Sequence, residues 1–277
     1  MKSAKERIPI ARAEYDDLYS YLRTLKDEGW SRPSACDGWR VCDVTAHLII
    51  TTDFQSGMVR EGLAGKAMVI NEDAGVSPQS RRDAIARGAI ELRERLGASL
   101  LESFTQHYDS LFRLLNSLRP EQLNLPARHP VGPEGKVTVG TYIDLVVLET
   151  ALHGWDIRWA ASPSARLSDQ SIPVLMEYAE PWLRRILHPK TTSGEVYRYR
   201  FQVSAMKARD LVVEGHGLAE TSASGSAPTA TLHCDANTFL LLHFGRLSFQ
   251  KALEEGLLTI DGDREAVLRL DRWVAGV

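Results

Sequence analysis

Residues 137–160 form an apolar helical stripe that ionisable side chains interrupt. The apolar members of the stripe are Tyr142, Leu145, Val146, Leu152 and Ile157. The same face carries Glu149, His153 and Asp156. Because a buried carboxylate costs several kcal/mol unless a positive group compensates it, this helix needs a cation. The i, i+4 spacing of Glu149 and His153 stacks them roughly 5–6 Å apart at Cβ, a separation that one metal ion can bridge. The stretch therefore predicts a buried helix whose metal takes a third ligand from elsewhere.

The length and composition of the chain fit a soluble protein of two domains. Its 277 residues exceed the usual domain size of roughly 100–200 residues. Hydrophobic residues make up 44% and charged residues 25%, which is ordinary for globular proteins. Three cysteines, an odd number, favour reduced thiols over a disulfide framework, and we interpret all three as small buried hydrophobes.

The charge pattern argues against nucleic acid and membrane partners. The net charge is -3, the isoelectric point is near 6.3, and the basic residues are scattered rather than clustered. The most apolar run, residues 144–155, is too short for a membrane span of about 20 residues. No signal-peptide core follows the basic start, so we expect a cytoplasmic protein.

Four amphipathic helices are expected in the first part of the chain. The periodicity places them at residues 9–29, from 39 onward, 82–118 as one helix or a bent pair, and 137–160. Residues 61–80 lose periodicity and are interpreted as a long connection over the bundle. Short loops rich in proline and glycine favour a bundle whose site is assembled from facing helices.

Two further histidines lie on these helices. His47 lies at the edge of the second helix's apolar stripe and can reach the bundle interior. From position alone, a packed core histidine is the alternative interpretation. His107 is interpreted as a packed or solvent-edge residue.

The pattern changes after residue 165 to that of an α+β domain. A helix over residues 169–187 leads to strands at 197–203, 211–213, 230–234 and 257–260. Helices are expected at 236–244, 248–255 and after Asp263, with Asp235 and Asp263 as N-caps. We therefore predict two domains, residues 1–165 and 166–277, the second with helices covering one sheet.

Three segments together resemble one known family. They are C-D-G-W-R-V-C-D-V-T-A-H-L at residues 36–48, L-E-T-A-L-H-G-W-D at 148–156, and L-L-L-H-F-G-R-L-S-F at 240–249 followed by A-L-E-E-G-L-L-T-I-D-G-D. This combination is similar to the mycothiol-dependent maleylpyruvate isomerase family. The resemblance implies a two-domain α+β protein, with an N-terminal DinB-like four-helix bundle and a C-terminal sterol-carrier-like α/β sandwich.

The resemblance also implies a site. In the family a divalent metal, usually zinc, is held at the positions of His47, Glu149 and His153, and mycothiol is the thiol cofactor. The family's arginine near the metal corresponds to Arg246. The usual C-P-G-W stands here as C-D-G-W, a loop departure that leaves the ligands unchanged. The extra length around residues 61–80 puts the small substrate maleylpyruvate in question.

Two imidazoles and one carboxylate leave a fourth coordination position open, the pattern of catalytic zinc. A thiol bound there is deprotonated at neutral pH and becomes a nucleophile. Asp156 is a candidate acceptor for the N–H of a ligand histidine, or else a partner of Arg158. Arg246 would hold an anion of the substrate or cofactor, the alternative being a surface arginine.

The leading hypothesis is a mycothiol-dependent enzyme acting on an electrophilic small molecule by S-transfer or thiol exchange, for example in antibiotic assembly. The first alternative is maleylpyruvate cis-trans isomerisation in aromatic degradation. The second is a non-enzymatic carrier of an apolar ligand with a structural metal. A metal-free bundle that buries Glu149 and His153 is a third. The oligomeric state and the identity of the metal stay open.

Overall fold

The structure is a computed structural model that divides into two compact units, Met1–Ser171 and Ile172–Val277. It describes residues 4–66, 78–128, 137–159, 161–162, 164–188, 195–204, 206–215, 217–223 and 225–273. Each unit is described by itself.

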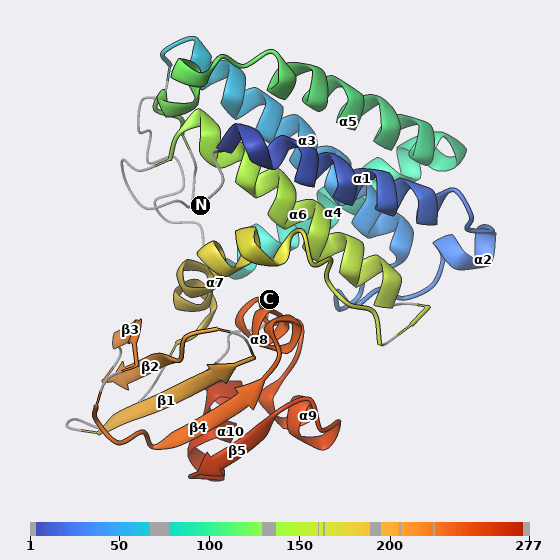
Figure 1. Ribbon diagram of the computed structural model, residues 1–277. Coiled ribbons are helices and arrows are strands. Elements are labelled where there is room, and N and C mark those ends of the chain that lie inside the picture. The colour runs from blue at the N-terminus through green and yellow to red at the C-terminus, as the bar shows by residue number, and fades with distance from the viewer. Residues whose placement is uncertain are drawn as a thin grey trace. The chain divides into compact units, whose positions relative to one another are not determined.

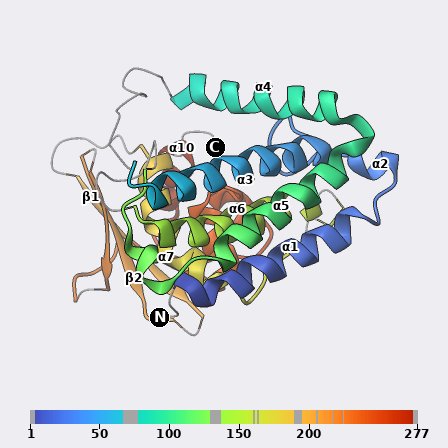
Figure 2. The same cartoon turned by 90° about the horizontal axis from the view of Figure 1, so that it is seen from above.

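The first unit is a helical bundle with one additional long helix (Figure 1). The bundle helices are α1 (Ile8–Leu22), α3 (Val41–Leu63), α5 (Leu100–Asn116) and α6 (Val139–Trp159). The fifth helix, α4 (Pro78–Leu96), lies alongside α3 (Figure 2). The short segments are η1 (Ala4–Arg7), α2 (Asp27–Trp30), η2 (Gly97–Ser99) and η3 (Pro120–Asn124). The bundle expected from the periodicity is confirmed.

Aromatic side chains and one hydrogen bond hold α1, α5 and α6 together. Tyr15 of α1 stacks on Phe104 and Tyr108 of α5, with ring centroids 5.6 and 4.8 Å apart. The hydroxyls of Tyr108 and Thr150, on α6, are 2.9 Å apart, which satisfies both groups in a buried setting. This packing fixes the level of α6 in the bundle and with it the level of Glu149.

A buried ion pair attaches α4 to the start of α3. Arg93 Nε donates to Asp43 Oδ1 at 2.9 Å, and Asp43 is only 2% exposed. The other carboxylate oxygen of Asp43 accepts from the backbone N–H of Arg40 at 2.9 Å and so caps α3. One carboxylate therefore fixes the first turn of α3, which directly precedes the turn that carries His47.

Two sequence expectations for this unit need correction, and a third had left two alternatives open. The first helix ends at Leu22 rather than near Gly29, because residues 27–30 form the separate turn α2. The long connection is shorter than residues 61–80, since α3 continues to Leu63 and α4 begins at Pro78; residues 67–77 lie outside the described residues. Of the two alternatives for residues 82–118, one helix or a bent pair, the structure has the pair: α4 and α5 are separated at Gly97, whose φ of +51° suits glycine.

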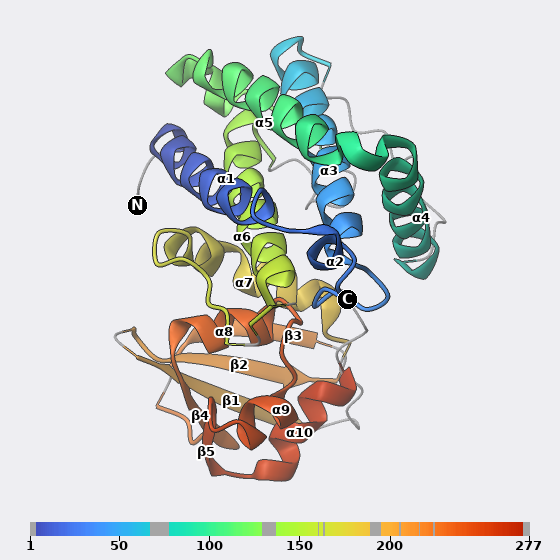
Figure 3. The ribbon, with the colours of Figure 1, turned by 90° about the vertical axis from the view of Figure 1, so that its right-hand side faces the viewer.

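The second unit begins with α7 (Ile172–Ile186) and contains a five-stranded sheet (Figure 3). The strands are β1 (Val196–Val203), β2 (Arg209–Glu214), β3 (Gly217–Ser222), β4 (Ala230–Cys234) and β5 (Thr259–Gly262). Their order is β3-β2-β1-β4-β5, with β1 and β4 parallel and the other pairs antiparallel. The helices are α8 (Ala236–His243), α9 (Phe249–Glu254) and α10 (Arg264–Trp273).

One face of this sheet carries the core of the second unit. Tyr199 and Phe201 on β1 are fully buried, in the alternation expected of a half-buried strand. The Tyr199 hydroxyl donates to the carbonyl of Ala266 on α10 at 2.9 Å, and Phe201 contacts Phe239 of α8 at 5.3 Å between centroids. Both helices therefore pack on the same face.

The expected N-caps are present. Asp235 accepts from the Thr238 N–H at 2.7 Å, and Asp263 accepts from the Ala266 N–H at 2.9 Å. Strand β3 was not expected from the sequence, because the residues of this short edge strand, G-L-A-E-T-S, lack the alternation that marks a half-buried one. Strand β5 begins later than expected, at Thr259.

Candidate metal centre

Helices α3 and α6 bring His47, Glu149 and His153 together. His47 Nε2 lies 3.7 Å and His153 Nε2 lies 3.3 Å from the same oxygen, Glu149 Oε2. The ligand atoms of the three residues all lie within 4.8 Å of one another. The two histidine rings meet edge to face, with centroids 4.8 Å apart. His47 is therefore not simply a histidine packed among apolar side chains, because its ring faces a carboxylate.

Neighbouring side chains restrain the ring of His47. The Thr51 hydroxyl, one helical turn further along α3, is 3.3 Å from Nε2. The indole of Trp39, in the loop before α3, lies 5.2 Å away between ring centroids. The C-D-G-W loop therefore packs against a candidate ligand instead of merely leading into the helix.

Glu149 is the electrostatic centre of the cluster. Its side chain is 30% exposed. Burial acts to raise the pKa of its carboxyl, but the hydrogen bonds from His153 and His47 outweigh burial, and the pKa lies well below its ordinary value. Glu149 is therefore a carboxylate at neutral pH, as a metal ligand must be.

His153 lies between two carboxylates. Burial acts to lower its pKa, but hydrogen bonds with Asp156, Cys36 and Glu149 raise the pKa well above the ordinary value. The cluster thus favours positive charge at this point, whether a proton or a metal ion supplies it.

A buried carboxylate orients His153. Asp156, with no solvent exposure, accepts from His153 Nδ1 at 2.8 Å, so Nε2 is directed toward Glu149. Histidine ligands of metals usually donate their second ring N–H to such a carboxylate. The backbone carbonyl of Asp156 in turn accepts from the Ala35 N–H at 3.1 Å, which ties the loop before α3 to the end of α6.

Cys36 is the residue that the sequence interpretation missed. Its thiol donates to Asp156 Oδ2 at 3.3 Å, and the side chain is only half-buried. The interpretation as a small buried hydrophobe is therefore wrong for Cys36, whereas Cys42 and Cys234 are buried. No local pattern marks this contact, because 120 positions of sequence separate the two partners.

The donor set fits a catalytic divalent metal. Two imidazole nitrogens and one carboxylate oxygen converge, and the remote nitrogen of His153 is held by a second carboxylate. A second group of potential ligands, Cys36, His153 and Asp156, shares His153. Because Asp156 is already engaged with His153 Nδ1, the first group is the better candidate.

Arg246 lies in the second unit, in the turn after α8. It is half-buried, and its Nη1 donates to the carbonyl of Phe244 at 2.9 Å. Its role beside the metal stays a prediction.

Among the residues that the structure describes, none of the helices has the length and apolar character needed to cross a membrane.

The fold and this cluster define a two-part protein, a helical bundle with a candidate three-ligand metal centre followed by a sterol-carrier-like α+β unit. The chain belongs to the mycothiol maleylpyruvate isomerase family: the model of that family's N-terminal domain matches residues 11–158. Residues 186–274 match the SCP-2 sterol transfer family.

Solved structures show the same fold. A crystal structure of the mycothiol-dependent maleylpyruvate isomerase superposes with a TM-score of 0.62 at 13% identity, covering 94% of this chain and 96% of that one. A mutant of that isomerase with a histidine replaced by alanine gives the same values. None of the curated protein sequences matches this chain.

Proposed function

We propose that this protein is a metal-dependent enzyme that uses the thiol of mycothiol on an electrophilic small molecule. The observation that carries the proposal is the convergence of His47, Glu149 and His153, with His153 held from behind by the buried Asp156. Membership of the mycothiol maleylpyruvate isomerase family supports mycothiol as the thiol.

Each residue of the cluster has a distinct part in this proposal. His47 and His153, through Nε2, and Glu149 would hold the metal, and Asp156 keeps His153 in the tautomer that presents Nε2. Zinc, or another divalent metal, when bound lowers the pKa of a thiol ligand so that the thiolate forms at neutral pH. Arg246 is proposed to bind an anionic group of the thiol or of the substrate.

Two reactions are compatible with this chemistry. In S-transfer or thiol exchange the thiolate displaces a leaving group, which departs with the bonding electron pair, and the sulfur stays on the substrate. In cis-trans isomerisation it adds to an activated double bond, permits rotation and leaves again. The family description favours maleylpyruvate as the substrate to test first. The antibiotic pathway stays a prediction without further support. A purely structural metal is disfavoured because the group that converges among the described residues has three ligands, which is the pattern of a catalytic site.

Cobalt substitution tests the proposal directly. The protein stripped with a chelator should take up one Co²⁺, and its visible spectrum should change when mycothiol is added, because the sulfur enters the coordination sphere. A spectrum that mycothiol leaves unchanged would contradict the assignment. Incubation with maleylpyruvate and mycothiol then separates the reactions, since isomerisation leaves the free thiol concentration constant and transfer lowers it.

A further inference from the structure

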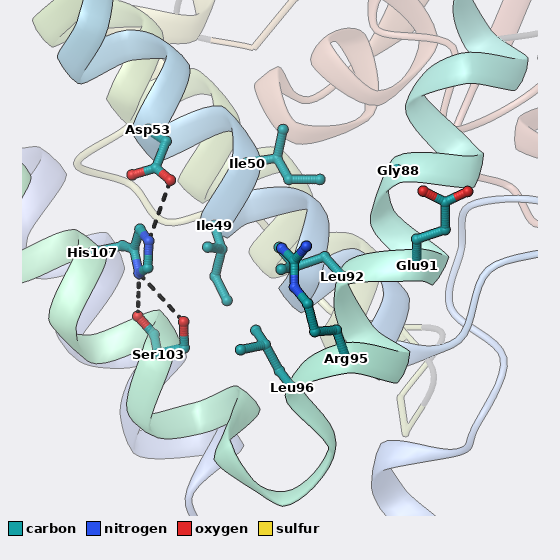
Figure 4. Close-up of a pocket in the computed structure, with 10 residues that line it drawn as sticks. All are labelled: Ile49, Ile50, Asp53, Gly88, Glu91, Leu92, Arg95, Leu96, Ser103 and His107. Carbon is teal, nitrogen blue, oxygen red and sulfur yellow. Dashed lines mark hydrogen bonds and ion pairs between the residues drawn. The ribbon is translucent and has the colours of Figure 1, made fainter.

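A pocket lies between α3, α4 and α5, away from the candidate metal centre (Figure 4). Its volume is ≈ 340 Å³, within the range of roughly 300–1,000 Å³ typical of small-molecule sites. His47 faces Glu149 on α6, whereas Ile49 and Asp53 lie on another side of α3 and face α4 and α5. The pocket is therefore a second potential site within the first unit.

One wall of this pocket is apolar. It consists of Ile49, Ile50, Leu92 and Leu96. Ile50 is 37% exposed, so part of this wall is open to solvent. Gly88 of α4 keeps the space open, since a Cβ at this position would meet only Ile50 Cδ1 at 3.8 Å. An apolar ligand could cover these side chains.

Arg95 supplies a positive charge at the same wall. In Figure 4 its guanidinium points into the pocket toward the side chains of Ile50 and Leu92. Within the described part of the chain, no carboxylate pairs with Arg95. A guanidinium is always charged at neutral pH and has five donors, so it favours an anionic partner.

The two acidic residues that line the pocket, Asp53 and Glu91, do not pair with the guanidinium of Arg95. Asp53 Oδ2 lies 3.2 Å from His107 Nε2, and His107 Nδ1 donates to the Ser103 carbonyl at 2.7 Å. Asp53 is therefore paired with His107 rather than with Arg95. In Figure 4 the carboxylate of Glu91 is directed away from Arg95.

We propose that this pocket binds a small amphipathic carboxylate, with the carboxylate on Arg95 and the hydrocarbon part against Ile49, Ile50, Leu92 and Leu96. A bidentate pair between a guanidinium and a carboxylate fixes the orientation of the ligand, and the apolar wall excludes water from one side of it. The site is independent of the metal centre and of the reaction proposed above.

Three probes with the same six-carbon chain test the charge preference. Hexanoate, 1-hexanol and hexylamine are titrated into the full-length protein, and binding is followed by the backbone amide shifts of Gly88 and Leu92. Hexanoate should bind saturably and about tenfold more tightly than hexanol, the ratio expected for one charge-assisted hydrogen-bonded pair. Hexylamine should bind no better than hexanol.

Variants of single residues on α4 test whether Arg95 causes the preference for hexanoate over hexanol. Arg95→Ala should remove the preference for hexanoate over hexanol, whereas Arg87→Ala, an exposed arginine of α4 that does not line the pocket, should leave it intact. Gly88→Leu should fill the pocket and abolish binding of both probes. Equal affinities for all three probes, tighter binding of hexylamine, or a preference for hexanoate that survives Arg95→Ala would overturn the proposal.

Discussion

His153 Nδ1 lies 2.8 Å from Asp156 Oδ2, one turn further along the same helix, and this contact decides which nitrogen His153 presents to Glu149. Asp156 has no exposure to solvent. A buried carboxylate must be compensated, so this contact holds a proton on Nδ1 and fixes the orientation of the imidazole.

Asp156→Asn should weaken metal binding by about 10–100-fold, because the amide no longer enforces the tautomer that presents Nε2 of the histidine. The affinity is measured by competition with a chromophoric chelator. Asp169→Asn, at an exposed position outside the cluster, is the control. Unchanged affinity in the Asp156 variant would mean that the contact does not serve metal binding.

The thiol of Cys36 should contribute to metal affinity as well, but less than Asp156 does. Cys36→Ala removes a donor to Asp156 and should lower metal affinity a few-fold, as expected for one net hydrogen bond. Cys36→Ser keeps a donor and should restore most of the affinity. Cys42→Ala, which removes the second cysteine of the same segment, should leave metal affinity as it is. If the alanine and serine variants of Cys36 behaved alike, the hydrogen bond would not be the cause.

His153→Ala should release the metal and abolish activity, because only two ligands remain. Helix content should stay largely intact, since the bundle core consists of other side chains. Elemental analysis and far-ultraviolet circular dichroism measure the two properties. A variant that retained its metal and turned over normally would contradict the proposed site.

Arg246→Ala should leave the metal content unchanged and raise the KM for mycothiol or for the electrophile. If the contact strengthens in the transition state, kcat should fall as well. Arg264→Ala, at the start of α10 in the same unit, is the control. Steady-state kinetics equal to those of the wild type would return Arg246 to the role of a surface arginine.

His243 should make the second unit less stable at acidic pH. Burial lowers its pKa from 6.5 to about 3, and its ring packs against Phe239 with centroids 3.7 Å apart. Below pH 6.5 the unfolded chain binds a proton that the folded chain does not bind, so stability falls as the pH decreases toward 3. The expected slope is about 1.4 kcal/mol per pH unit.

A comparison with His243→Leu isolates this contribution, because leucine does not titrate. The difference in unfolding free energy between the wild type and this variant, measured with urea from pH 7 to pH 4, should change in favour of the variant as the pH falls. A difference that is constant with pH would show that His243 is not held neutral in the folded state.

The sequence by itself determined the helices of the bundle and the residues of the candidate centre. Helical periodicity is a local property, so α3 and α6 and the i, i+4 pair of Glu149 and His153 follow from short segments. The N-caps Asp235 and Asp263 were predictable for the same reason. Strand β3 was missed because its residues, G-L-A-E-T-S, lack an alternating pattern.

Only the tertiary structure decided which distant groups meet. Cys36 joins Asp156, and His107 joins Asp53, through the packing of separate elements, and no local pattern encodes such pairs. The pocket at Arg95 likewise exists only in the folded chain, because its lining residues come from three helices, α3, α4 and α5. The identity and the spacing of side chains can be read directly from the amino-acid sequence. Contacts between separate elements depend on how their apolar faces pack together, and this packing exists only in the assembled core.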